Sequence, residues 1–202
     1  MKYARMAGVL SASLLIGACG SMQPKPQKIP VPPERIFQKG YSFAPLNERG
    51  WLVMGRNESD LTLGKRGENP DETFFIGANV QEIAPFKTKN TADFVRWFKE
   101  HEAKAHEDQR YNVIQDDVTP HNEKGTDCVE SHSVIEDNAA VKRSNAPGVM
   151  ILEYLALACV HPKNKSIVVM IVYSHRYYPE YRDAAFHEKA SSVLNSLEFT
   201  DR

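Results

Sequence analysis

Histidine and cysteine side chains occur at two places in this sequence where metal chemistry has to be considered. His101 and His106 lie in "HEAKAH", and on a helix their spacing of five residues would separate them by about 140° around the axis. A metalloprotease pair needs a spacing of four, so we expect His101 to be a packed, hydrogen-bonded histidine. On a strand, Cys128, Glu130 and His132 would share one face. A disulfide at Cys128 would withhold its thiolate from a metal, so we predict no metal site.

Catalysis by a serine nucleophile or with a nucleotide finds no support in the motifs. The chain contains no Gly-x-Ser-x-Gly and no Ser-x-x-Lys, and it lacks a Walker loop and Gly-x-Gly-x-x-Gly. Asp116 and Asp117 are typical of a solvated strand end rather than of a catalytic carboxylate pair. We therefore predict no catalytic residue and no cofactor, and we expect that the chain is not an enzyme.

A stretch rich in tyrosine and arginine, "YSHRYYPEYR" at residues 173–182, is the strongest candidate for a binding surface. Tyrosine and arginine are enriched at the energetic centres of protein interfaces. The candidate partner surface consists of Arg176, Tyr177, Tyr178, Tyr181 and Arg182. The alternative is that half of these tyrosines pack beneath a helix that follows.

The first 18 residues have the features of an export signal. Lys2 and Arg5 precede a mainly apolar run, residues 6–16, which is about half as long as a helix that spans a bilayer. The run ends in "LIGAC", which resembles the lipobox of bacterial lipoproteins. That resemblance implies that Cys19 is the first residue after cleavage and carries the acyl chains that anchor the protein to a membrane. In enteric bacterial lipoproteins, an aspartate after the lipidated cysteine resembles a retention signal for the inner membrane. Gly20 and Ser21 follow Cys19 instead, so the resemblance implies a periplasm-facing position on the outer membrane, with the inner membrane as the alternative.

The remaining two cysteines, Cys128 and Cys159, are most simply a disulfide, because an exported chain folds in an oxidising compartment. A redox-active or metal-binding pair is the alternative, although no Cys-x-x-Cys spacing supports it. Removing residues 1–18, which contain two basic residues and no acidic one, changes the formal net charge from −1 to −3. This near-neutral charge gives no electrostatic footprint for nucleic acid.

Proline content and length define the domain organisation. Prolines at 24, 26, 30, 32 and 33 favour an extended spacer. We predict a signal peptide at 1–18, a lipidated cysteine with a Pro-rich tether at 19–38, and a single domain at 39–202.

Apolar periodicity within the domain predicts two helices among strands. The strands are expected at 50–56, 60–66, 72–83, 111–118, 126–137, 149–162 and 166–175, with a short edge strand near 197–200. The first helix is expected at 89–110, begins with Asn90 as its N-cap, and carries an apolar stripe of Phe94, Trp97, Phe98 and His101. The second helix is expected at 179–197, with a stripe of Phe186, Ala190, Val193, Leu194 and Leu197.

The expected disulfide also predicts a strand register. In an antiparallel hairpin that places Cys128 opposite Cys159, Ile135 lies opposite Leu152, because each pair of residue numbers has the same sum. Long strands joined by hairpins, with helices on the faces, indicate an α+β fold built on an antiparallel sheet of about six or seven strands, flanked by two main helices.

The order of these elements is similar to that of the Mog1/PsbP-like fold. The stretch "VVMIVYSHRYYPEYRDAAFHEKASSVLNSLEF" resembles the terminal strand–helix–strand of its bacterial members. "DCVESHSVIED" and "LACVHPKNKSIVVMIVYSHR" resemble uncharacterised proteobacterial lipoproteins of that kind. This resemblance implies a domain that binds or assists other proteins and has no shared catalytic residues.

Three functions are open at this point. We expect a non-catalytic, lipid-anchored envelope protein that binds or stabilises an envelope protein partner. The alternatives are an envelope hydrolase with an unrecognised site, and a metal- or small-ligand-binding module that uses histidines such as His132 and His161.

Overall fold

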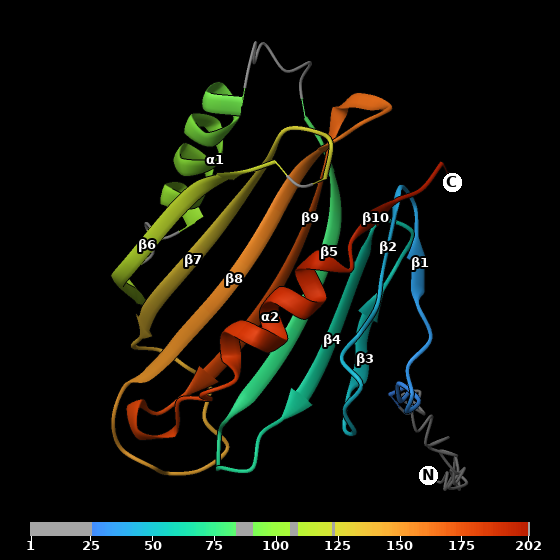
Figure 1. Cartoon of the computed structure of the whole chain (residues 1–202). Helices are drawn as coiled ribbons and strands as arrows, with labels where there is room; N and C mark the ends of the chain where they lie inside the picture. The colour runs from blue at the N-terminus through green and yellow to red at the C-terminus, as the bar shows by residue number, and fades with distance from the viewer. Residues whose placement is uncertain (1–25, 84–90, 106–108, 123, 202) are drawn as a thin grey trace, which may run out of the picture.

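The computed structural model describes residues 26–83, 91–105, 109–122 and 124–201. Its centre is a seven-stranded antiparallel sheet in the order β3-β4-β5-β9-β8-β7-β6 (Figure 1). These strands are β3 Leu52–Arg56, β4 Asp60–Arg66, β5 Thr73–Glu82, β6 Tyr111–His121, β7 Cys128–Asp137, β8 Met150–His161 and β9 Asn164–Tyr177. The predicted α+β class and strand number are confirmed.

The predicted register of the β7–β8 hairpin is confirmed as well. Cys128 lies opposite Cys159 and Ile135 lies opposite Leu152, and the two cysteines form a disulfide. The cysteine pair therefore joins β7 and β8, the second and third strands from the β6 edge of the sheet.

A second, three-stranded sheet, not predicted from the sequence, packs beside the first. It has the order β1-β2-β10, with β1 at Ile36–Gln38, β2 at Tyr41–Phe43 and β10 at Glu198–Phe199. The segment 197–200 therefore contributes a strand as expected, but it pairs with β2 instead of extending the large sheet. Tyr41 and Phe43 are fully buried, so this small sheet supplies part of the core.

The predicted boundary of the tether is wrong, because attachment to the domain begins before residue 39. The Val53 amide donates to the carbonyl of Gln27 over 2.8 Å, and the Ile29 amide donates to the carbonyl of Trp51 over 2.9 Å. Strand β1 also lies within the range assigned to the tether. Prolines at 30, 32 and 33 are compatible with this extended path, since an edge segment needs few backbone donors.

Helix α2, Phe186–Asn195, covers one face of the large sheet. Its predicted apolar stripe is confirmed, since Phe186, Ala190, Val193, Leu194 and Leu197 are all buried. They pack in one core with Trp51, the small sheet and the inward residues of β5, β8 and β9. The helix begins later than predicted, because residues 179–181 form the separate short 3-10 helix η1, Pro179–Tyr181.

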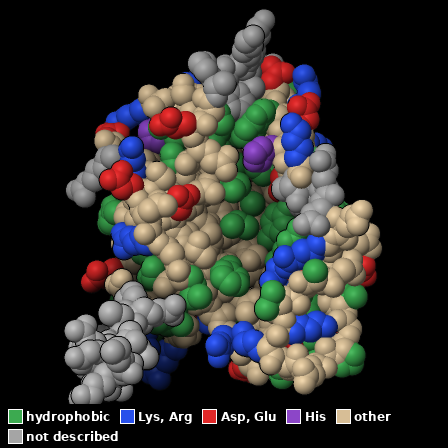
Figure 2. All heavy atoms as spheres, turned by 180° about the vertical axis from the view of Figure 1, so that it is seen from behind, with side chains coloured by type: hydrophobic (Ala, Val, Ile, Leu, Met, Phe, Trp, Pro, Cys, Tyr) green, Lys and Arg blue, Asp and Glu red, His purple; other side chains and the backbone are tan. Residues whose placement is uncertain are grey.

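Helix α1, Thr91–Ala105, packs on the opposite face, against β6 and β7. Phe94 and Phe98 are buried there with Val118, Val129 and Ala158. Seen from behind, this face gathers apolar side chains near its centre (Figure 2). The expected N-cap Asn90 and His106 lie outside the described residues, as do the predicted signal peptide at 1–18 and Cys19.

The predicted stripe of α1 is wrong at one position. His101 is exposed and stacks on Trp97 with ring centroids 5.4 Å apart. Glu102 is the residue that turns inward and is only 8% exposed. Since residues at i and i+4 share a helix face, the buried side is the Phe94, Phe98 and Glu102 row.

Candidate functional site

The tyrosine- and arginine-rich segment lies at the end of β9 and in η1, and strand alternation divides it between two faces. Tyr173, His175 and Tyr177 point to the face that α2 covers. Tyr173 is fully buried, with its ring centroid 5.5 Å from that of Phe186 in α2. The alternative considered for this segment, tyrosines packed beneath the second helix, therefore holds for Tyr173.

Most of the candidate partner surface is committed to contacts inside the protein. Tyr177 is 3% exposed and Tyr178 is 7% exposed. The Tyr178 hydroxyl donates to Asp71 over 3.1 Å, and Arg176 pairs with the buried Asp137 at 3.0 Å. Contrary to the prediction, Tyr177 is therefore not part of an accessible surface, and Tyr178 exposes only the small part of its side chain that lines the groove described next.

Only the end of the segment remains accessible. Tyr181 is 42% exposed, and the side chain of Arg182 is about half exposed. Beside Tyr181 lies a groove of 260 Å³ lined by Pro70, Ala146, Pro147, Tyr178 and Glu180.

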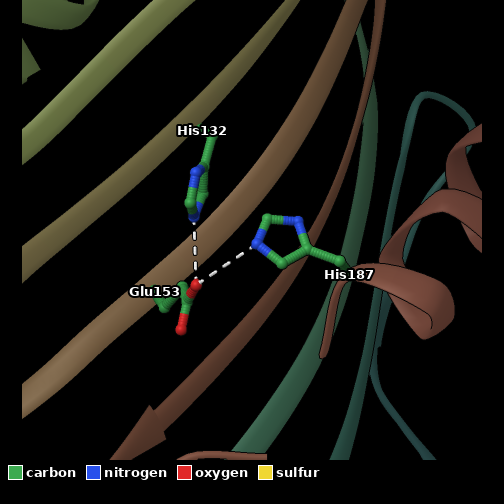
Figure 3. A group of neighbouring side chains, drawn as sticks. All are labelled: His132, Glu153 and His187. Carbon is green, nitrogen blue, oxygen red and sulfur yellow. Dashed lines mark hydrogen bonds and ion pairs between the residues drawn. The ribbon is translucent and has the colours of Figure 1, made fainter. Parts of the chain in front are cut away.

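Glu153 is the centre on which several predicted residues converge. This carboxylate lies in β8 and is fully buried. Arg182 binds it through two atoms, Nε to Oε2 at 3.0 Å and Nη2 to Oε1 at 2.7 Å. The Tyr177 hydroxyl donates to Oε2 over 2.9 Å, and His132 Nε2 lies 3.0 Å from Oε1. His187 Nε2 completes the cluster at 3.9 Å (Figure 3).

The strand register explains why these distant residues meet. His132 in β7 lies opposite Leu155 in β8, so Glu153 is its diagonal neighbour on the same face. Glu153 in turn lies opposite His175 in β9, which places Tyr177 diagonally across from it. Arg182 follows η1, and His187 is in the first turn of α2. The cluster therefore forms where the end of β9 and the start of α2 meet the sheet.

Electrostatics keep Glu153 ionised. Burial raises the pKa of this carboxyl, but the hydrogen bonds from Arg182, His132 and Tyr177 lower it more, to about 2. The guanidinium of Arg182 supplies the opposite charge in a two-point geometry that fits a carboxylate. The buried charge is therefore compensated within the protein.

Two histidines and a glutamate are also a ligand set that zinc accepts. One nitrogen of His132, one of His187 and a carboxylate oxygen of Glu153 all lie within 4.8 Å of one another. However, Oε1 of Glu153 already accepts from Arg182, so a cation would have to sit beside a guanidinium. We therefore interpret the cluster as a charge network that joins α2 to the sheet.

The other predicted ligand residues are not brought together. Cys128, Glu130 and His132 share one strand face as expected, but Cys128 is in the disulfide. Glu130 lies 3.7 Å from His121. His161 is six positions along β8 from the residue that faces His132, a distance of about 20 Å.

A second buried carboxylate, Glu102, was missed in the sequence. Its Oε1 accepts hydrogen bonds from Ser131 at 3.0 Å and from Tyr154 at 3.1 Å, whereas its Oε2 is buried without a partner. Burial, with a smaller contribution from nearby Asp116, raises the pKa of this carboxyl to about 7, although the two hydrogen bonds oppose the shift. No local signal distinguishes Glu102 from its exposed neighbours Glu100 and His101.

Comparisons with known proteins give limited likenesses. No family model matches the chain, and no curated protein matches it in sequence. The solution structure of cyanobacterial PsbP (CyanoP) from Synechocystis sp. PCC 6803 is 18% identical, with 92% of this chain and 99% of that chain covered and a TM-score of 0.47. The STAR-related lipid transfer protein from Xanthomonas axonopodis is 13% identical, with 73% and 96% covered and a TM-score of 0.28.

The fold class thus stands on the chain's own strand order and contacts, and the Mog1/PsbP-like family remains a prediction. No helix within the described ranges is long and apolar enough to cross a bilayer.

Proposed function

We propose that this chain is a non-catalytic protein of the bacterial envelope, anchored by lipid at Cys19, that binds or stabilises a protein partner. One observation carries the proposal. The sequence has three cysteines, and the pairing of Cys128 with Cys159 leaves Cys19, at the end of "LIGAC", as the cysteine outside the disulfide. A disulfide in the core fits an oxidising compartment, which is where a lipobox would send the chain.

The accessible remainder of the tyrosine–arginine segment is the part we assign to the partner. Tyr181 lies beside the 260 Å³ groove, and Val149 is also partly exposed near that end of the sheet. An aromatic side chain next to a shallow apolar groove is a common anchor at protein interfaces.

The anchor is tested by the intact mass of the protein purified from membranes. Cleavage before Cys19 and the added mass of acyl chains support the proposal, and both features are expected to disappear in Cys19→Ser. A full-length mass without lipid would overturn the anchor. Separation of inner and outer membranes in the same preparation tests the expected outer-membrane position.

The partner is tested by crosslinking in cells followed by mass spectrometry. We expect one envelope protein to be captured by the native chain, and its yield to fall several-fold in Tyr181→Ala. Lys163→Ala is the matched control, because this exposed residue forms a surface ion pair with Asp201 away from the groove. Equal yields from all three proteins would remove Tyr181 from the partner surface, and the capture of no specific protein would favour the hydrolase or ligand-binding alternatives.

A further inference from the structure

The N-terminal strip, residues 27–29, determines at which edge of the folded domain the segment from Cys19 joins it. Residues 27–29 run along β3, held by the two backbone hydrogen bonds to Trp51 and Val53 and by a bridge between Lys28 and Leu52. Strand β3 is the outer strand of the large sheet. A chain anchored at Cys19 would therefore be tied to the β3 edge.

The segment from Cys19 to Gln27, here called the tie, is short compared with the domain. Eight residue steps separate Cys19 from Gln27, so even a fully extended chain spans no more than about 28 Å. Strand β9, with 14 residues, is about 46 Å long. The domain therefore stays close to the bilayer, and the segment that leads to Cys19 leaves it at the β3 edge.

The opposite edge of the sheet lies far from this point. Six inter-strand spacings separate the two edge strands, which at the usual strand spacing places β6 about 29 Å from β3. Helix α1 packs at that distant edge. If the β3 edge lies against the membrane, β6 and α1 are the parts of the domain that point away from it.

Three basic side chains without an ion pair among the described residues lie on the β3 side of the domain. Lys28, Arg49 and Arg66 form no ion pair or hydrogen bond from their side chains within the described part of the chain. Arg49 is shared by two grooves, one of 350 Å³ with Lys28, Ile29 and Trp51, and one of 460 Å³ with Lys65, Arg66 and Lys189.

Two of the acidic groups near these grooves pair with lysines. Lys65 pairs with Glu48, and Lys189 pairs with Asp183 at 2.7 Å. Glu68 and Glu72 also line the larger groove, and Glu72 lies 2.8 Å from the buried His175. No acidic residue occurs from Cys19 to Pro33, where Lys25 and Lys28 are basic.

Strand β6 at the far edge exposes the carboxylates of Asp116 and Asp117, whereas the basic residues of that edge, such as Lys99 and Lys104, lie on α1. Phosphate groups of lipids attract cations and repel carboxylates near the surface. Tie length and charge therefore favour the same orientation.

We infer that the β3 edge, with Lys28, Arg49 and Arg66, is the surface that faces the membrane, and that the phosphate groups of anionic phospholipids are its ligand. This inference rests on the proposed anchor at Cys19. The short tie limits the distance, and the three basic side chains select which side turns toward the lipid.

The test uses the full mature chain, secreted with an ordinary signal peptide so that Cys19 is its free thiol. The thiol is coupled to a maleimide phospholipid in vesicles that contain phosphatidylglycerol. A benzophenone amino acid replaces Met54 on β3 in one protein and Ile114 on β6 in another, a matched pair because both side chains are 57% exposed. We expect at least about fivefold more lipid adducts from position 54.

A second arm separates the charges from the tie. Arg49→Gln/Arg66→Gln is compared with Lys99→Gln/Lys104→Gln, which removes two positive charges from α1. We expect the first pair to reduce the ratio of adducts several-fold, the second to leave it unchanged, and neutral phosphatidylcholine vesicles to reduce it for the native chain.

Equal adducts at positions 54 and 114 would overturn the inference. An unequal ratio that is insensitive to both the arginine changes and lipid charge would overturn the assignment of phosphate as ligand. Because the coupling is chemical, these outcomes are independent of whether cells acylate Cys19, which the intact mass decides separately.

Discussion

At the scale of single residues, two buried carboxylates of opposite pKa shift, Glu153 and Glu102, contribute to how the stability of this protein depends on pH. Glu153 is held ionised by Arg182, His132 and Tyr177, with a pKa lowered to about 2. Glu102 lies on the inner side of α1, where burial raises its pKa to about 7. The difference arises because Glu153 has a guanidinium partner, whereas Glu102 has only hydroxyl groups, with Asp116 nearby.

Removing the partner of Glu153 should destabilise the fold at neutral pH. We expect Arg182→Ala to lower the free energy of unfolding by about 1–3 kcal/mol, less than for a fully buried pair because Arg182 is half exposed. A lowered pKa adds stability above the ordinary carboxyl pKa, and that stability is lost as pH falls toward 2. The difference from the native protein, measured by urea unfolding, should therefore shrink between pH 4.5 and pH 2.

The surface pair of Lys163 and Asp201 is the control for that experiment. Lys163→Ala should change the free energy of unfolding by less than about 0.5 kcal/mol, because both partners are exposed. If Arg182→Ala behaves in the same way, the network around Glu153 does not stabilise α2 against the sheet.

Replacing Glu102 should increase the free energy of unfolding, whereas replacing Arg182 should decrease it. Its raised pKa means that folded-state stability is lost as pH rises from the ordinary carboxyl range through about 7. We expect Glu102→Gln to match the native protein at pH 5 and to exceed its free energy of unfolding by about 1–2 kcal/mol at pH 8. Glu100→Gln, on the exposed side of α1, should show no such pH dependence in the same urea titrations.

At the scale of elements, the disulfide cross-links β7 and β8, which lie next to the edge strand β6 in the large sheet. Cys128 and Cys159 are both fully buried, and the 31-residue separation encloses the loop at 138–149. Closing a loop of this length restricts the unfolded chain, which stabilises the fold.

The double substitution Cys128→Ala/Cys159→Ala should lower the free energy of unfolding by about 3–4 kcal/mol, as measured by denaturant titration. Cys19→Ser should leave it unchanged, because Cys19 precedes the folded domain. A loss below about 1 kcal/mol in the double variant would show that the strand pairing, and not the cross-link, holds β7 to β8.

The loop within this hairpin is attached to the turn between β4 and β5. Asp71 accepts hydrogen bonds from the backbone of Ser144 at 2.8 Å and from the Tyr178 hydroxyl at 3.1 Å. The hydrogen bond from the Ser144 side chain holds the pKa of Asp71 at about 2, against the effect of burial. Asp71 therefore orders the loop that borders the groove beside Tyr181.

At the scale of the whole molecule, the N-terminal strip belongs to the domain. Residues 27–29 lie along β3 and Ile29 packs against the main core. Its removal would expose apolar surface on Trp51 and leave backbone groups of β3 without partners.

We expect a chain that begins at Pro26 to have the same unfolding midpoint as the full mature chain. A chain that begins at Lys39 should be less stable by about 2 kcal/mol or more, because it lacks both the strip and β1. Thermal unfolding of the three proteins checks this, and equal midpoints would restore the domain boundary to residue 39.

The sequence by itself determined those features that depend on local periodicity. Phe74, Ile76 and Ala78 alternate with other residues along β5, so they share one face of the strand, and all three are buried. Two cysteines in one hairpin fixed the register of β7 and β8, because a register shift of one residue would turn every side chain to the other face. The stripe of α2 followed in the same way from its 3.6-residue period.

Only the tertiary structure decided which polar side chains turn inward. Tyr177 and Tyr178 are adjacent, yet both are buried, because each hydroxyl finds a carboxylate on a distant element, at Glu153 and Asp71. Glu102 replaces His101 on the inner side of α1 because Ser131 and Tyr154 lie beneath it. A buried polar group needs a partner to offset its desolvation, and the partners here are 24 to 107 residues away in the chain. Local periodicity contains no information about them, so the fold, and not the pattern, determined the candidate site.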